Sequence, residues 1–186
     1  MNGNASAEDT YRSYKQFEKG VAAKSSGDET GYLTGSNSFE LSDLSGNNLH
    51  YQLVLQTSAD DRDEITVTDT LPENVGFKVD NVKIALDENE FAKIKDKNVD
   101  WATAEYDETT RRLTIKISNY NKSGQEEHRI RIQYKVSVSD DPSWKNPSVG
   151  KLTYTNTATW GELTETTTTT VTRDVEQVKK TGWQDP

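Results

Sequence analysis

Cysteine is missing from this 186-residue chain. Its absence excludes disulfide bonds, thiolate metal sites, cysteine nucleophiles and internal thioesters, so any covalent cross-link must use other side chains. Long apolar runs are missing too. No stretch approaches the roughly 20 residues that cross a bilayer, and the opening residues have neither the basic end nor the apolar middle of a signal peptide. We expect no membrane insertion here, and the signal and anchor of an exported parent protein would lie outside this sequence.

Positive charge is also scarce. The chain has 22 Lys and Arg residues against 31 Asp and Glu residues, which gives a formal net charge of −9. The surface potential therefore has the wrong sign for a phosphate backbone, and no basic stripe compensates for it. Nucleic acid is not expected as a partner.

Alternation of apolar and polar residues is abundant. The odd positions of Leu49–Leu55 form an apolar face, as do the even positions of Arg129–Val138, and both patterns predict half-buried strands. Regular turns between the strands predict an all-β, antiparallel, immunoglobulin-like sandwich. One short helix is expected at Asp87–Lys95, where Asp87 could act as the cap. Weaker strand patterns occur at Glu64–Asp69, Gly76–Leu86, Val99–Tyr106, Arg112–Ser118 and Leu152–Trp160.

The two ends of the chain carry a short repeat. Tyr14–Lys19 and Val175–Lys180 share the order apolar, charged, Gln, apolar, charged, Lys. We therefore divide the chain into a disordered leader at 1–13, one sandwich domain at 14–174, and the start of a similar module or a linker at 175–186. The run Thr166–Thr170 could be a flexible spacer, but the final strand is the better interpretation, because threonine suits exposed β positions.

Three polar side chains occupy positions where alternation predicts apolar ones. Asp69 shares its face with Ile65, Val67 and Leu71, and Asn156 is in phase with Tyr154 and Ala158. Lys19 is in phase with Phe17. All three side chains are therefore predicted to point into the core, where an isolated charge is costly.

Their mutual burial would suggest a reaction. Desolvation favours a neutral amine on Lys19 and a protonated acid on Asp69. The amine could then attack the Asn156 carboxamide, with release of ammonia and formation of a Lys–Asn amide. The residues alone favour an ordinary interpretation, in which Asp69 begins a turn, Asn156 bonds to nearby backbone and Lys19 extends toward solvent.

The quoted motifs resemble those of the A-type isopeptide-forming domains of Gram-positive collagen adhesins and fimbrial shaft subunits. The resemblance rests on Lys19, on Thr68–Pro72 followed by Gly76 and Phe77, and on Tyr154–Ala158. It implies an extracellular, cell wall-attached stalk or shaft module whose partners are neighbouring modules of the same chain. It also implies a Lys19–Asn156 isopeptide bond with Asp69 as the catalytic acid. Lys15 and Lys24 are alternative sources of the amine.

Two other functions remain open at this point. The domain could bind a host matrix protein such as collagen, with Trp144 as the best loop candidate, although Trp144 could equally anchor its loop. A hydrolase is disfavoured because His50 and His128 occupy polar-face strand positions without a nucleophile or metal-ligand spacing. We expect no cofactor, no metal site and no turnover of a diffusing substrate. The acidic clusters 60–64 and 87–90 are interpreted as solvated turns rather than calcium loops.

Overall fold

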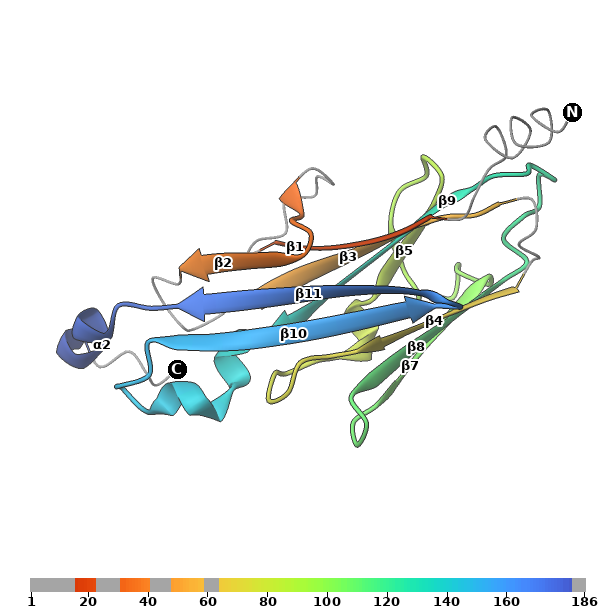
Figure 1. The fold of residues 1–186 in the computed structure, drawn as a ribbon. Helices are drawn as coiled ribbons and strands as arrows, with labels where there is room; N and C mark the ends of the chain where they lie inside the picture. Colours follow the sequence, from red (N-terminus) through yellow and green to blue (C-terminus); the bar gives the residue numbers. More distant parts are fainter. Residues whose placement is uncertain (1–15, 23–30, 41–47, 59–63, 182–186) are drawn as a thin grey trace, which may run out of the picture.

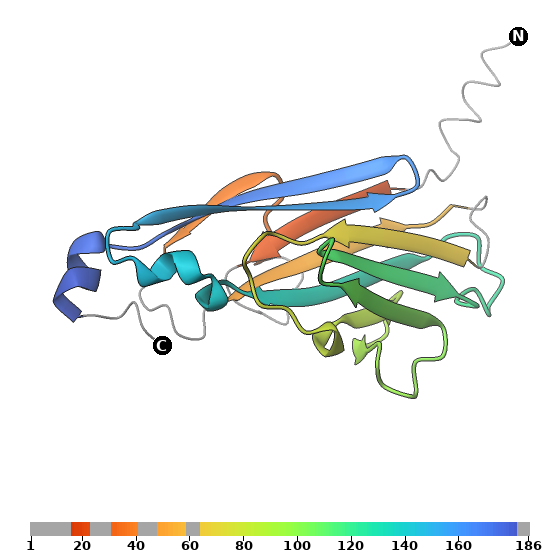
Figure 2. The ribbon, with the colours of Figure 1, turned by 90° about the horizontal axis from the view of Figure 1, so that it is seen from below.

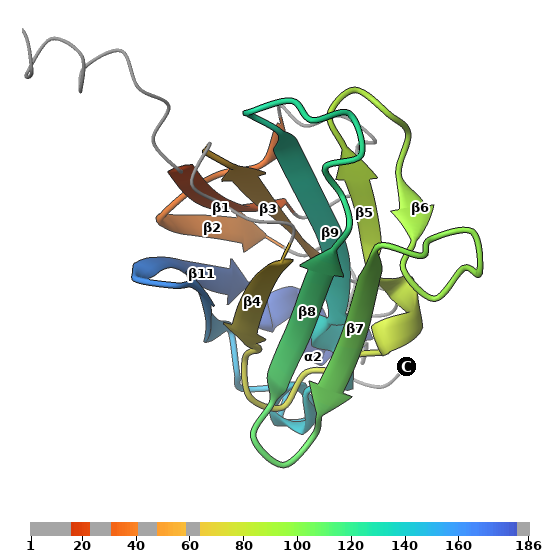
Figure 3. The ribbon, with the colours of Figure 1, turned by 90° about the vertical axis from the view of Figure 1, so that its right-hand side faces the viewer.

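The computed structural model describes residues 16–22, 31–40, 48–58 and 64–181. These residues form two β-sheets that pack face to face, which confirms the predicted all-β sandwich (Figures 1 and 3). Sheet A has the strand order β1 (Gln16–Ala22), β3 (Asn48–Gln56), β9 (Arg129–Ser137), β5 (Lys83–Leu86) and β6 (Ala92–Lys93). Sheet B has the order β2 (Ser36–Glu40), β11 (Leu163–Thr172), β10 (Lys151–Trp160), β4 (Glu64–Thr70), β8 (Arg112–Ser118) and β7 (Ala102–Asp107).

Neighbouring strands are antiparallel with one exception. β2 runs parallel to β11, with Ser36 beside Thr168 and Glu40 beside Thr172. The sandwich is therefore mixed at this edge rather than purely antiparallel. A parallel neighbour needs a connection that crosses over, and here more than 100 residues of chain separate the two strands.

Alternating residues of both sheets fill the space between them. On β3 the side chains of Leu49, Leu53 and Leu55 are fully buried, as the alternation predicts. Sheet B contributes the inward positions of β4, β8 and β10 in the same way. The core also contains Val21, Tyr51, Ile65, Val67, Leu113, Ile115, Ile117, Ile130, Ile132, Tyr134, Val136, Tyr154 and Trp160.

The prediction of a short helix at Asp87–Lys95 is wrong. Asp87 has a left-handed backbone (φ 53°), so it cannot cap a helix, and its carboxylate accepts a hydrogen bond from the Arg129 amide. The segment instead makes turns and the short strand β6, which pairs with β5. The strand predicted at Gly76–Leu86 is shorter than expected, because a 3₁₀ turn at Val79–Asn81 precedes β5.

The threonine run lies within β11. The interpretation as a final strand is confirmed, and the alternative of a flexible spacer is wrong. Its threonines are not all exposed, however. Thr167 and Thr169 are fully buried, whereas Thr166 is exposed. Thr157 on β10 lies opposite Thr166, and their hydroxyl oxygens are 3.0 Å apart on the outer face.

The described chain enters and leaves the sandwich at opposite ends. β1 begins at the end opposite α2 (Val175–Thr181), as Figures 1 and 2 show. In the predicted repeat, the segment around Val178 is helical, whereas Phe17 lies in a strand. A following module remains a prediction. In the described part of the chain, no helix is both long enough and apolar enough to span a membrane.

Candidate functional site

Lys19 lies in the middle of β1 with its side chain in the core. It pairs with Leu53 in the β1–β3 register, and only 1% of its surface is exposed. Its Nζ donates hydrogen bonds to Asp69 Oδ2 at 2.9 Å and to the Tyr134 hydroxyl at 2.7 Å. The predicted inward orientation of Lys19 is confirmed. The alternatives Lys15 and Lys24 lie outside the described residues.

Asp69 reaches the same place from the opposite sheet. It lies near the end of β4, opposite Ala158 on β10, and is 1% exposed. Its Oδ2 accepts hydrogen bonds from Lys19 and from the Tyr134 hydroxyl, so one oxygen serves two donors. Its Oδ1 is buried and has no hydrogen-bond partner among the described residues.

Asn156 is the third residue of the site. It lies on β10 two positions before Ala158, so it is the diagonal neighbour of Asp69 on the inner face of sheet B. Asn156 is fully buried, and neither Oδ1 nor Nδ2 of its carboxamide makes a hydrogen bond of normal geometry with a described residue. An unsatisfied buried polar group costs about 1–3 kcal/mol, so burial of this carboxamide is energetically costly.

Two tyrosines complete the site, and the alternation along their strands predicts only that both lie on apolar faces. Tyr51 on β3 and Tyr134 on β9 lie opposite each other with ring centroids 5.5 Å apart. The Lys19 Nζ lies 4.6 Å from the Tyr51 ring centroid and 5.3 Å from that of Tyr134. The amine is therefore held against two aromatic faces in an otherwise apolar core.

The electrostatics favour neutral partners. Burial lowers the pKa of the Lys19 amine, although the nearby Asp69 carboxylate opposes the shift. Burial raises the pKa of the Asp69 carboxyl against the opposing effects of Lys19 and Tyr134. Burial also raises the pKa of both Tyr51 and Tyr134, and the adjacent Asn156 side chain opposes that rise. A neutral amine beside a protonated acid is the state that desolvation promotes here.

Two buried hydroxyls flank the carboxamide on β11. Thr167 lies directly opposite Asn156, and Thr169 lies opposite Tyr154. Their Oγ1 atoms are buried and have no hydrogen-bond partner among the described residues. Only the strand register could reveal them, since every second residue of a threonine run must face the core once β11 pairs with β10.

The polar-face assignment of His128 is wrong. This residue is 3% exposed, with Nδ1 at 2.8 Å from an Asp87 carboxylate oxygen and Nε2 at 2.8 Å from the Asn121 side-chain oxygen. It joins the β5 end of sheet A to the start of β9. His50, on the outer face of β3, is partly buried. No cluster of three or more metal-ligating His, Asp or Glu side chains occurs in the described ranges.

Trp144, the loop candidate for ligand binding, is not exposed. It is fully buried in the 3₁₀ turn Pro142–Lys145, and its Nε1 donates to the Tyr154 hydroxyl at 3.0 Å. Tyr154 in turn donates to Asp141 at 2.8 Å, and Arg173 stacks on the indole. Trp144 anchors the loop to the sandwich and offers no exposed surface.

Comparisons with known proteins agree with the fold. No protein-family model and no curated protein matches the chain. The major pilin subunit BcpA of Bacillus cereus is similar in structure, with a TM-score of 0.52 and 12% identity over 87% of this chain. The pilus backbone RrgB of Streptococcus pneumoniae has a TM-score of 0.49 and 12% identity over 78% of this chain, and the collagen adhesin of S. aureus has 0.42 and 15% over 73%.

The chain spans less than half of each of these structures: 41% of the B. cereus pilin, 31% of the pneumococcal backbone and 47% of the adhesin. At 12% identity, the likeness to the B. cereus pilin shows a shared β-sandwich fold and nothing about the residues of the site. The functional argument therefore depends on the buried site itself.

Proposed function

We propose that this chain is a structural stalk or shaft module of a Gram-positive cell-surface adhesin or pilus, stabilised by a self-formed Lys19–Asn156 isopeptide bond. The observation that supports it most is the burial of an amine, a carboxyl and a carboxamide in one part of the core, the carboxamide without a hydrogen bond of normal geometry. Its likeness in fold to a pilin is consistent with this role. The module acts on itself once and has no diffusing substrate.

The proposed reaction uses the three buried side chains. The neutral Lys19 Nζ attacks Asn156 Cγ while the protonated Asp69 donates to the Asn156 carbonyl oxygen. The C–Nδ2 bond then breaks, the leaving nitrogen takes up a proton and departs as ammonia, and Nζ loses a proton through Asp69. One amide bond replaces another. The folded core holds the amine close to the carboxamide and so makes the attack effectively unimolecular. The bond therefore forms only after folding.

The position of the bond explains a mechanical role. Lys19 lies on the first strand and Asn156 on β10, the strand before the last one described. Force that enters at β1 and leaves beyond β10 would pass through the covalent bond and bypass the core between the two positions. Such a link suits a module that must carry tension along its length.

The intact mass of the folded protein tests the bond. We expect a mass below the sequence mass by one ammonia, and no deficit in Lys19→Ala or Asn156→Ala. Thr155→Ala is the matched control because Thr155 is the outward-facing neighbour of Asn156 on β10, and it should keep the deficit. A deficit that survives Lys19→Ala would assign the amine to another lysine, and a wild-type mass without deficit would refute the bond.

Tyr134 is expected to assist bond formation. Its hydroxyl bonds both Lys19 and Asp69, so it positions the amine and connects it to the acid. Tyr134→Phe should slow ammonia loss on the order of 100-fold, the lower range for proton-transfer assistance. The time course of intact mass after refolding measures the rate. Tyr106→Phe, outside the site, is the control, and equal rates in both variants would contradict this role of Tyr134.

No described surface favours the alternative of a matrix-protein trench. Leu33, at 48% exposure, is the one large hydrophobic side chain exposed in the described part of the chain. Binding to collagen therefore gains no support from a specific contact surface here.

A further inference from the structure

The outer face of sheet A carries a cluster of lysines far from the buried site. Lys83 on β5, Lys93 on β6 and Lys135 on β9 are exposed, and Lys78 lies beside them ahead of the Val79–Asn81 turn. None of these four side chains makes an ion pair with a described residue.

Two lysines face each other across the β5–β6 pair of this surface. Lys83 lies directly opposite Lys93 in the β5–β6 register, and Lys135 lies directly opposite His50 in the β3–β9 register. Burial lowers the pKa of His50, and the positive charges of Lys135 and Lys83 lower it further. The positive potential of the lysines therefore extends to this neighbouring side chain. Like charges placed directly opposite destabilise a sheet unless an anion offsets them.

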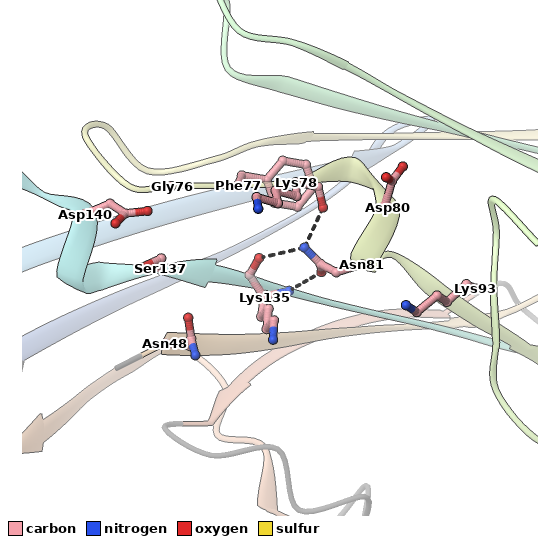
Figure 4. A pocket seen from close by; sticks show the side chains of 10 residues that line it. All are labelled: Asn48, Gly76, Phe77, Lys78, Asp80, Asn81, Lys93, Lys135, Ser137 and Asp140. Atoms are coloured by element: carbon pink, nitrogen blue, oxygen red, sulfur yellow. Dashed lines mark hydrogen bonds between the residues drawn. The ribbon is translucent and has the colours of Figure 1, made fainter. Parts of the chain in front are cut away.

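Lys78, Lys93 and Lys135 border a groove, shown in Figure 4, and Lys83 borders a second hollow next to it. The groove has a volume of about 640 Å³ and is continuous in its lining with the second hollow of about 260 Å³, since Asn81, Lys93 and Lys135 line both. The Asn81 side chain fixes one wall, because its Oδ1 accepts from the Lys135 amide at 2.9 Å and its Nδ2 donates to the Lys78 carbonyl. The groove is thus preformed.

The opposite end of the groove has a different chemistry. Asp140 lies there, away from Lys93 in Figure 4, and Asn48 and Ser137 add further polar groups. A second carboxylate, Asp80, lines the groove beside Asn81. Carboxylate and amide oxygens accept hydrogen bonds from hydroxyl groups, whereas they repel other carboxylates. A ligand that carries both negative charges and hydroxyl groups matches both ends of the groove, and an acidic polypeptide matches only the lysine end.

We infer that this groove binds a linear sulfated polysaccharide, with sulfate groups against Lys78, Lys83, Lys93 and Lys135 and sugar hydroxyls toward Asp140 and Asn48. Lysine suits such a ligand because its ammonium is a point charge that tolerates varied sulfate positions, unlike the fixed fork of arginine. The lysine contacts are solvent-exposed, so the binding is expected to weaken as salt increases.

Fluorescence anisotropy with a labelled heparin decasaccharide tests the inference. We expect saturable binding to the wild type and a Kd raised about tenfold or more in the double variant Lys83→Gln/Lys135→Gln. The matched control is Lys116→Gln/Lys151→Gln, which removes the same charge from exposed positions of sheet B and should change Kd less than twofold. The melting temperature and intact mass of both variants establish that fold and buried site are intact.

Competition separates the ligand classes. Unlabelled heparin should displace the probe, whereas neutral dextran should not, and poly-glutamate should need at least about tenfold more charge equivalents. No binding by the wild type, or equal loss in the two double variants, would overturn the inference. Displacement by poly-glutamate as effective as that by heparin would overturn the polysaccharide assignment in favour of an acidic polypeptide.

Discussion

Pulled from its two ends in a single-molecule force experiment, the wild-type module is expected to show no extension from the chain between Lys19 and Asn156. The bond makes these positions covalent neighbours, so tension reaches β10 from β1 without loading the sheets between them. Asn156→Ala should instead unfold and release that chain. Roughly 140 residues at about 3.4 Å each would add on the order of 450 Å of length.

The control for the force experiment is Thr155→Ala, on the same strand but facing outward. It should behave as the wild type does. A wild type that releases the same length as Asn156→Ala would show that the two positions are not bonded. A step of intermediate length in the wild type would mean that a different lysine is joined.

The second large effect is on thermal stability. On the chain-entropy scale used for disulfides, a cross-link that closes a loop of this length contributes up to about 5 kcal/mol. At about 2–4 °C per kcal/mol for a chain of this size, Asn156→Ala should lower Tm by roughly 10–20 °C. Differential scanning calorimetry at neutral pH measures this, with Thr155→Ala unchanged within about 0.5 kcal/mol.

Asp69→Ala should be more destabilising than Asn156→Ala. Both changes prevent the bond, but Asn156→Ala leaves Lys19 paired with Asp69, whereas Asp69→Ala leaves a buried amine without its carboxylate. An unsatisfied buried polar group costs about 1–3 kcal/mol beyond the lost cross-link. Lys19→Met/Asp69→Leu should recover much of that difference without restoring the bond. Equal Tm values for wild type and Asn156→Ala would contradict the stabilising role of the cross-link.

Period-two alternation predicted the three residues of the site because strand geometry alone decides which face a side chain occupies. Lys19, Asp69 and Asn156 each interrupt an apolar phase, and each is buried. The same rule extends one residue further than we applied it: the even positions of β9 face inward, and His128 continues that phase at the start of the strand. Its burial was therefore predictable.

Other features depend on contacts between segments distant in the sequence. Tyr51 and Tyr134 look like ordinary core residues, and only the approach of sheet A to Asp69 brings the Tyr134 hydroxyl to the carboxyl group and the Tyr51 ring to Lys19. The parallel pairing of β2 with β11 has no local signal. The like-charged pair of Lys83 and Lys93 becomes visible only once the strand register is known.

One measurement addresses the Lys19–Asn156 bond most directly: tandem mass spectrometry of a tryptic digest of the folded, then denatured protein. Trypsin cannot cleave after an acylated lysine, so the bond predicts a branched species in which residues 16–24 are joined to residues 152–173 through Lys19 and Asn156, with loss of one ammonia. Recovery of residues 16–19 and 152–173 as separate, unmodified peptides, with no branched species, would contradict the account.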